Sequence, residues 1–207
     1  MKMNILAIGA HPDDLEIGCA GTLIKYAEQG HDVHMLVMTG GECGGDPSVR
    51  CEEQQLSADL IGAKELFWGG YQDAKLPLDQ SLIQDIEYSV ASLKPTFILA
   101  PYFDDTHQDH RHLSQCTVSA TRYTRNVLFY ECPTTQNFTP TVFVDITEQM
   151  DRKVCALLAH SSQVHRTRVN NVDIVSVAQA NARFRGVQGR TQWAEGFVPL
   201  RLFINVG

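Results

Sequence analysis

The sequence predicts an α/β fold in which helices cover both faces of a mostly parallel sheet. Two observations predict it. Short apolar runs alternate along the chain with longer amphipathic stretches, the pattern of strands joined by crossover helices. The chain has 207 residues, 43% hydrophobic and 20% charged, as in ordinary globular proteins that bury one core. No internal repeat or low-complexity linker divides it, so we expect a single domain over residues 1–207.

Each element follows from its local pattern. Asn4–Gly9 (NILAIG) is a short apolar run and predicts a buried strand. A helix is expected over 15–29, because Leu15, Cys19 and Leu23 recur on one side at helical spacing. The same reasoning predicts strands at 33–38, 66–68, 96–100 and 127–130, and helices at 50–61, 81–93 and 110–122. In the less regular tail we expect a strand at 141–145, helices at 149–160 and 175–185, and an edge strand at 200–206.

Composition excludes several classes of protein. Lys and Arg total 17 and Asp and Glu total 24, giving a formal charge of −7 and no basic face for nucleic acid or an anionic membrane. No stretch approaches the roughly 18 apolar residues of a membrane span, and the N-terminus lacks the apolar region of a signal peptide. We therefore expect a soluble, cytoplasmic protein. The six cysteines form no Cys-x-x-Cys pair and should be mostly buried thiols, with Cys43 and Cys51 accessible in the glycine-rich loop 39–49.

Ligands of such sheets bind outside the carboxyl ends of the strands, which directs attention to residues 10–16, 39–50, 101–112 and 131–137. Two of these segments are dense in metal-binding residue types. The first reads AHPDDLE from Ala10, and the second reads DDTHQDHRH from Asp104. His11 precedes Asp14 by three residues, and His107 precedes His110 by three, so each segment projects its polar side chains to one side.

Charge argues for a metal at this edge. The carboxylates of the two segments would raise one another's pKa unless a cation neutralised them. Mixed imidazole and carboxylate ligands suit Zn²⁺, with Fe²⁺, Co²⁺ or Mn²⁺ as alternatives. Taken alone, each segment is equally well explained as a polar loop whose aspartates cap a helix. Spacing alone does not choose among His107, His110 and His112 as the ligand.

Several motifs resemble those of one family and occur in its order along the chain. They are AHPDDLEIG at 10–18 with GTL at 21–23, TGGE at 39–42 with Arg50-x-x-Glu53, PY at 101–102 with HQDH at 107–110, AHSSQ at 159–163, and AEGF at 194–197. The sequence thereby resembles the LmbE-like or PIG-L family of N-acetylglucosaminyl deacetylases.

That resemblance implies a role for each matched residue. The metal ligands would be His11, Asp14 and His110, and Asp13 would be the general base. His107 would stabilise the tetrahedral intermediate or act as an acid, with Asp109 orienting and charging its ring. Arg50 would contact the acyl group; the alternative is a helix-start arginine paired with Glu53 or with solvent.

Other positions have weaker implications. Asp105 and Trp193 stand where some relatives carry tyrosine, which concerns oxyanion stabilisation and substrate preference. Tyr102 and Trp193 would line the pocket or belong to the core. Glu16 would support the site or act as a favourable first-turn acid.

The resulting interpretation is a zinc-dependent N-deacetylase on a Rossmann-like sheet. Its substrate would be a small N-acetylated amino sugar of the N-acetylglucosamine type or a conjugate, and the resemblance makes a homo-oligomer plausible. One alternative is a metal-dependent amidase or esterase acting on a non-sugar acyl group. The other is a non-catalytic metal- or nucleotide-binding module, which the missing G-x-G-x-x-G after the first strand disfavours.

Overall fold

The computed structural model describes residues 2–204 and contains a seven-stranded sheet in the order β3-β2-β1-β4-β5-β7-β6. Strands β1 to β5 are parallel, and β7 pairs antiparallel with both β5 and β6. The strands are β1 Asn4–Gly9, β2 Asp32–Thr39, β3 Glu65–Tyr71, β4 Phe97–Pro101, β5 Val127–Tyr130, β6 Val142–Asp145 and β7 Ala194–Arg201. The predicted mostly parallel sheet is confirmed.

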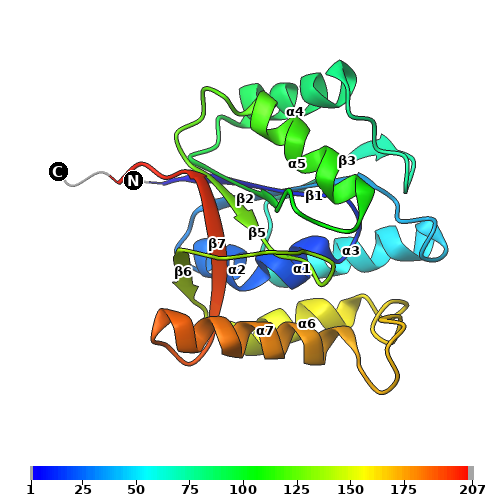
Figure 1. The fold of residues 1–207 in the computed structure, drawn as a ribbon, viewed down its shortest axis with the longest axis vertical. Helices are drawn as coiled ribbons and strands as arrows, with labels where there is room; N and C mark the ends of the chain where they lie inside the picture. The colour runs from blue at the N-terminus through cyan, green and yellow to red at the C-terminus, as the bar shows by residue number, and fades with distance from the viewer. Residues whose placement is uncertain (1, 205–207) are drawn as a thin grey trace.

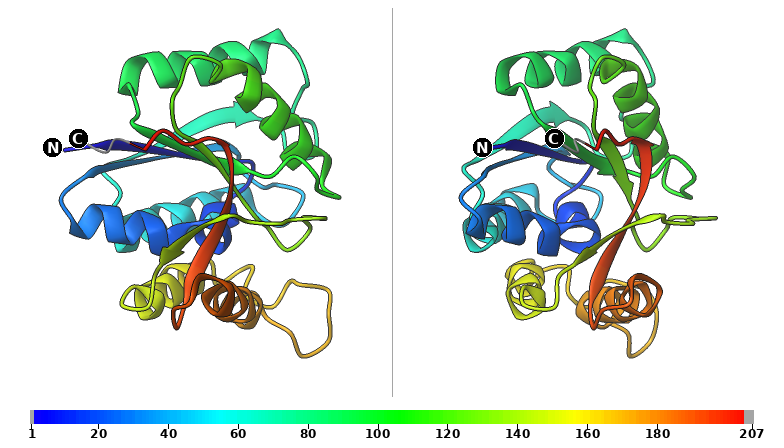
Figure 2. Two further views of the ribbon diagram at one scale, coloured as in Figure 1. Left: turned by 60° about the vertical axis from the view of Figure 1, so that its left-hand side comes forward. Right: turned by 90° about the vertical axis from the view of Figure 1, so that its left-hand side faces the viewer.

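Helices cover both faces of the sheet, as expected (Figure 1). They are α1 Asp14–Gly18, α2 Ala20–Glu28, α3 Pro47–Ile61, α4 Gln80–Leu93, α5 Gln108–Ala120, α6 Met150–Ala159 and α7 Ile174–Gly189. Helices α4 and α5 lie on one face and α1 to α3 on the other. Figure 2 shows α6 and α7 as a further layer outside α1 to α3, reached by β6 and by the lower part of β7. None of the described helices is long and apolar enough to cross a bilayer.

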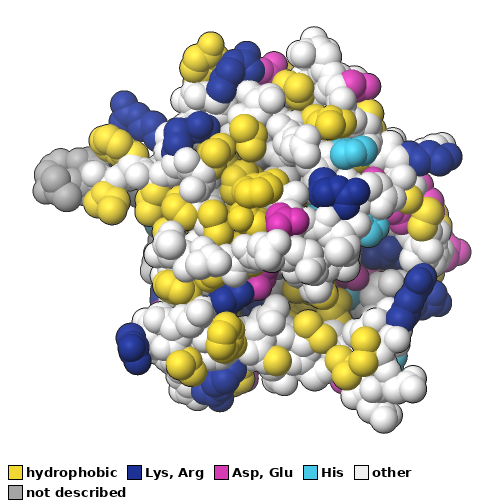
Figure 3. Space-filling view, in the orientation of Figure 1, with side chains coloured by type: hydrophobic (Ala, Val, Ile, Leu, Met, Phe, Trp, Pro, Cys, Tyr) yellow, Lys and Arg dark blue, Asp and Glu magenta, His cyan; other side chains and the backbone are white. Residues whose placement is uncertain are grey.

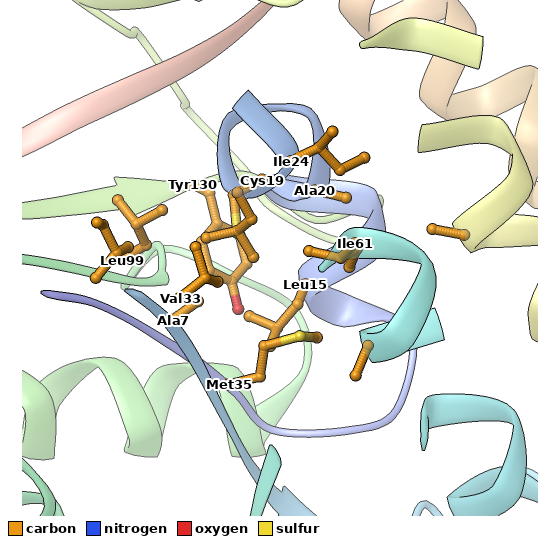
Figure 4. Packing of buried hydrophobic residues seen from close by; sticks show 14 of the residues in the cluster. Ala7, Leu15, Cys19, Ala20, Ile24, Val33, Met35, Ile61, Leu99 and Tyr130 are labelled. Carbon is orange, nitrogen blue, oxygen red and sulfur yellow. The ribbon is translucent and has the colours of Figure 1, made fainter. Parts of the chain in front are cut away.

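The main core lies between the sheet and the α1 to α3 layer. Figure 4 shows Leu15 of α1 next to Met35 of β2, and Ile24, Val33 and Tyr130 belong to the same cluster. A second cluster, which includes Ile8, Met38 and Leu113, fills the space under α4 and α5. Both faces of β1 and β2 are buried, so close packing holds these strands rigidly. The loops that follow them therefore begin at fixed positions.

The single helix expected over 15–29 is wrong: the chain forms α1 and α2, separated at Cys19, whose φ is −149°. The backbone N–H groups of Gly21 and Thr22 at the start of α2 donate to the carboxylate of Glu195 at 2.8 and 2.7 Å. Glu195 also accepts from the buried ammonium of Lys153 at 2.5 Å. A remote carboxylate therefore satisfies the backbone groups that the break exposes.

The edge strand expected at 200–206 is also misplaced. The strand begins at Ala194 and lies inside the sheet between β5 and β6, and residues 205 and 206 of the expected range lie outside the described residues. The sequence AEGFVPLR has weak strand propensity because it contains Glu, Gly and Pro. Pairing with two neighbours and burial of its first four residues stabilise it instead.

Candidate active site

The two polar segments meet at the carboxyl ends of β1 and β4, on the right-hand side of Figure 1. They line a cavity of about 340 Å³ together with residues from four other loops. Its lining includes His11, Asp13, Asp14, Cys43, Arg50, Asp73, His107, His110 and Arg168. Every loop that supplies these residues follows a strand or leads into a helix at this one edge.

A tight turn after β1 presents the first segment. Asp13 has φ 89°, a left-handed conformation that aspartate and asparagine tolerate better than most residues. Asp14 Oδ2 accepts the backbone N–H groups of Ala10 and His11 at 3.0 and 2.9 Å, which fixes the loop around its carboxylate. Asp14 Oδ1 is thereby turned towards the second segment.

The second segment forms the first turn of α5. His107 caps the helix, because its ring Nδ1 accepts the backbone N–H of Asp109 at 3.3 Å. His110 lies one turn further on the same side, with ring centroids 4.9 Å apart. His112 points elsewhere, with its Nδ1 2.7 Å from the Leu76 carbonyl oxygen. The structure therefore separates His112 from the other two imidazoles, which the sequence alone could not do.

The two segments converge closely. One ring nitrogen from each of His11, His107 and His110 lies within 4.8 Å of the others. His110 Nε2 is 3.2 Å from Asp14 Oδ1, and His11 Nδ1 is 3.5 Å from Asp14 Oδ2. Side chains almost a hundred residues apart in the sequence thus share one space that a single ion could occupy.

In His11 and His110, the ring nitrogen that does not face Asp14 contacts a carboxylate. Asp105 Oδ2 lies 3.1 Å from His110 Nδ1, while Asp73 Oδ1 and Asp109 Oδ2 lie 3.0 and 3.2 Å from His11 Nε2. In each ring the other nitrogen faces Asp14. A carboxylate behind an imidazole whose free nitrogen points at a common centre is the usual arrangement of a metal-ligating histidine.

The electrostatics of the cluster also fit a cation. Burial disfavours charge on both rings, yet Asp109 and Asp14 raise the pKa of His11 well above its usual value, and Asp14 and Asp105 raise that of His110 to about 9. Burial likewise opposes ionisation of Asp14, but His110 and His11 hold its pKa well below the usual range. His110 Nε2 is buried, and apart from its 3.2 Å approach to Asp14 Oδ1 it has no hydrogen-bond partner among the described residues. A divalent cation would supply the positive charge and occupy that lone pair.

Cys132 is a weaker candidate ligand. Its Sγ lies 4.0 Å from Asp14 Oδ1, and it groups with Asp14 and His110. Burial and the nearby carboxylate of Asp14 raise the pKa of the Cys132 thiol well above its usual value. Because the thiolate is the form that binds metals, this side chain is poorly suited to the role.

Asp13 and Arg50 form the wall next to the cluster. Burial raises the pKa of Asp13 to about 6, against the opposing influence of His160 and Arg50. Arg50 Nη2 is 3.5 Å from Asp13 Oδ2, and the guanidinium donates to the carbonyl oxygens of Gly41 and Pro12 at 2.6 and 2.7 Å. Gly41 has φ 67°, and a Cβ there would lie 2.0 Å from Arg50 Nη1, so this approach requires glycine.

The alternative pairing of Arg50 with Glu53 is wrong. Glu53 instead accepts hydrogen bonds from Ser161 and Ser162 at 2.9 and 2.7 Å. These serines belong to the AHSSQ motif, so the interaction ties α3 to the loop after α6. Arg50 is left facing Asp13 at the cavity.

The expected partnership of Asp109 with His107 needs correction. The carboxylate of Asp109 faces His11 and accepts the backbone N–H groups of Ala74 and Leu76 at 2.7 and 3.2 Å. Only the backbone N–H of Asp109 contacts His107. Burial, reinforced by the charges of His11 and His110, lowers the pKa of His107, so the expected imidazolium is not favoured.

The sequence alone did not indicate Asp73, and it left Glu16 as either a supporting residue or a first-turn acid. Asp73, in the loop after β3, contacts His11 and accepts the backbone N–H of Cys43 at 2.9 Å. Glu16 is fully buried, accepts from Gln54 and Ser57 at 2.7 Å each, and lies 3.5 Å from His160 Nε2. Glu16 thus supports the wall behind Asp13, since the Gln54 side chain also accepts the Asp13 backbone N–H at 3.2 Å.

The aromatic residues considered for the pocket belong to the core. Tyr102 packs with Phe129 and Phe138, and Trp193 packs under Arg183, whose guanidinium lies 3.7 Å from the ring centroid. Neither lines the cavity. Of the cysteines, Cys43 is exposed and Cys51 partly exposed, as expected, but Cys155 is also exposed.

Comparison with known proteins agrees with this geometry. The PIG-L family, described as GlcNAc-PI de-N-acetylase, matches residues 6–121. An uncharacterized deacetylase, YaiS, of Escherichia coli K12 is 32% identical over 170 residues, covering 78% of this chain and 92% of its own. A diacetylchitobiose deacetylase of Thermococcus kodakarensis is 28% identical, covering 77% and 70%. The structure of an N,N'-diacetylchitobiose deacetylase from Pyrococcus horikoshii superposes with a TM-score of 0.84 at 25% identity, covering 96% and 84%.

Proposed function

The chain belongs to the PIG-L family, and we propose on that basis that it is a zinc-dependent N-deacetylase of small amino-sugar substrates. The reaction hydrolyses the amide of an N-acetylglucosamine-type compound or conjugate to a free amine and acetate. Relatives named as diacetylchitobiose deacetylase and as probable N-acetyl-α-D-glucosaminyl L-malate deacetylase support the substrate class. The observation that carries the proposal is the convergence of His11, Asp14 and His110 beside the buried carboxylate of Asp13.

The metal would be held by His11 Nδ1, His110 Nε2 and the carboxylate of Asp14. These atoms face one another, and the far nitrogen of each ring is already paired with a carboxylate. Two imidazoles and one carboxylate form the ligand set of many catalytic zinc sites. When bound there, zinc lowers the pKa of water to about 7 and polarises the acyl oxygen.

Asp13 acts as the general base. Its carboxylate lines the cavity next to Asp14 and is positioned to take a proton from the attacking water. The same proton can then pass to the nitrogen of the leaving amine, so that the C–N bond breaks without forming an amide anion. Burial, which raises the pKa of Asp13 to about 6, makes it a stronger base than an exposed aspartate.

His107 and Arg50 stabilise the charge that develops. Because His107 Nδ1 accepts a backbone N–H, its neutral ring carries the proton on Nε2 and can donate to the acyl oxygen. Arg50 lines the same cavity, and its positive charge attracts the acetate that is released.

Asp109→Asn is expected to weaken metal binding rather than the proton-transfer step. The substitution weakens the interaction of Asp109 Oδ2 with His11 Nε2. Losing such a partner of a ligating imidazole typically costs about 10- to 100-fold in metal affinity. Competition with a fluorescent chelator measures the affinity, and Asp151→Asn, at an exposed position on α6, is the matched control. Unchanged zinc affinity combined with an altered pH profile would instead place Asp109 in the acid–base chemistry of His107.

The proposed function is tested by measuring acetate and free amine from N-acetylglucosamine, N,N'-diacetylchitobiose, simple acyl amides and simple esters. We expect acetate and amine in equal amounts from at least one amino sugar, loss of the activity with a chelator, and its return with zinc. Faster hydrolysis of non-sugar amides or esters would favour the broader amidase or esterase. Bound dinucleotide and no hydrolysis would favour the non-catalytic module.

A further inference from the structure

A second cavity of about 540 Å³ adjoins the first and shares Asp13, Pro133 and Thr134 with it. Its walls come from the loop 161–173, from α7 and from the segment after β5. Besides Asp13, its charged lining residues are Glu131 and Arg166, and Val169, Val172 and Val177 are among its apolar ones. An acyl group held at the metal would leave the amine side of the substrate at this shared boundary.

We propose that the second cavity binds the amine side of the substrate and that Arg166 recognises an anionic group there, a carboxylate or a phosphate. The proposal rests on the N-deacetylase function, because that reaction fixes which end of the substrate lies at the metal. The substrate class becomes an N-acetylated amino sugar that carries a negative charge beyond the sugar ring.

The charges around the second cavity support an anion. Of its two acidic lining residues, Asp13 lies at the boundary with the metal cavity, and Glu131 is already held by Arg185 through two hydrogen bonds of 2.7 and 2.8 Å. Arg166 lies within 4 Å of no carboxylate among residues 2–204, and its Nη1 donates only to the carbonyl oxygen of Gly44, at 3.0 Å. The rest of this guanidinium is available for a bidentate contact with a carboxylate or phosphate.

Arg166 is also attached to the wall of the metal cavity. Gly44, which accepts its hydrogen bond, lines that cavity, and a Cβ on Gly44 would lie 2.6 Å from Arg50 Nη1. Gln163 donates to the same carbonyl oxygen at 3.4 Å. Arg168, on the same loop as Arg166, also lines the metal cavity. In Figure 3, basic side chains lie beside imidazoles and acidic groups at the right-hand edge, the side where the parallel strands end.

The distribution of charge favours one orientation of the substrate. Asp13, Asp14 and Asp73 line the metal cavity, and their negative charges disfavour a second anion there beside the released acetate. An anionic group therefore lies most favourably away from them, near Arg166. Val169, Val172 and Val177 supply an apolar wall of the second cavity for the carbon skeleton between the two ends.

The test uses three N-acetylglucosamine probes: the methyl glycoside, the carboxymethyl glycoside and the 1-phosphate. We expect the zinc-loaded enzyme to have a kcat/KM about 10- to 100-fold higher for at least one anionic probe than for the methyl glycoside, the range expected for hydrogen bonds between charged groups. Arg166→Gln should reduce that ratio to within about threefold of unity. Arg125→Gln, an exposed arginine outside both cavities, should keep the ratio.

Equal kcat/KM for charged and neutral probes, or a preference that survives in Arg166→Gln, would overturn the proposal. Binding of an anion to the metal itself would survive that substitution, so it is distinguished. The preferred anionic probe shows whether the group is a carboxylate or a phosphate. If no probe is hydrolysed, the deacetylase function has failed, and calorimetric titration still decides the anion site. Tighter binding of the 1-phosphate than of the methyl glycoside, lost in Arg166→Gln, would support it, and equal binding would overturn it.

Discussion

Asp13→Asn is expected to lower kcat for acetate release by about 10²- to 10⁴-fold while the protein keeps its metal. Asparagine has the size of aspartate and tolerates the left-handed backbone at φ 89°, so the turn after β1 should persist. An amide cannot take a proton from water, however. The hydrogen bonds that fix Asp14 come from the backbone of Ala10 and His11 and do not involve the Asp13 side chain.

Metal content by mass spectrometry and kcat from acetate release are measured on the same sample. Asp151→Asn is the control for the removal of a carboxylate at an exposed site. Hydrolysis at the parental rate by Asp13→Asn would refute the role of Asp13 as the base. Loss of metal together with activity would instead make Asp13 part of the metal site.

His110→Ala is expected to abolish both metal retention and activity. The substitution removes a proposed ligand. The loss of metal affinity should therefore exceed the roughly 100-fold that follows from removing a hydrogen-bond partner of a ligand. It also leaves the buried carboxylates of Asp14 and Asp105 without the imidazole that each now faces. Some loss of folding stability should accompany the loss of metal, because these carboxylates then lack a counter-charge.

His112→Ala supplies the matched control on the same helix. Its ring faces the Leu76 carbonyl oxygen rather than the cavity, so this variant should keep its metal and most of its activity. Zinc content after dialysis against a weak chelator, together with circular dichroism to monitor folding, distinguishes the two variants. A folded His110→Ala protein with parental zinc content would contradict the proposed ligand set.

The first half of the fold and the position of the site could be predicted because local patterns determine them. Buried apolar runs specify β1, β2, β4 and β5, and the carboxyl-end rule then brings His11 and His110 to one edge. The same rule would have found Asp73 if β3 had been predicted to its full length. The sequence predicts that strand only over 66–68, whereas pairing with β2 extends it to Tyr71.

Features that depend on remote contacts could not be predicted. The break between α1 and α2 needs Glu195 and Lys153, which are distant in the sequence. The role of Asp109 depends on the start of α5. There its backbone N–H donates to His107 Nδ1, while its carboxylate faces His11. Neighbouring positions on a helix point in different directions, so proximity to His107 in the sequence was a poor guide.

The central claim is that His11, Asp14 and His110 hold one zinc ion. Zinc-edge X-ray absorption of the protein loaded with one equivalent of zinc tests it most directly. We expect two imidazoles and oxygen ligands at about 2.0–2.2 Å, a spectrum unchanged in His107→Ala, and one imidazole fewer in any His110→Ala that retains zinc. A sulfur ligand at about 2.3 Å, as Cys132 would give, or a third imidazole that disappears in His107→Ala, would contradict the claim.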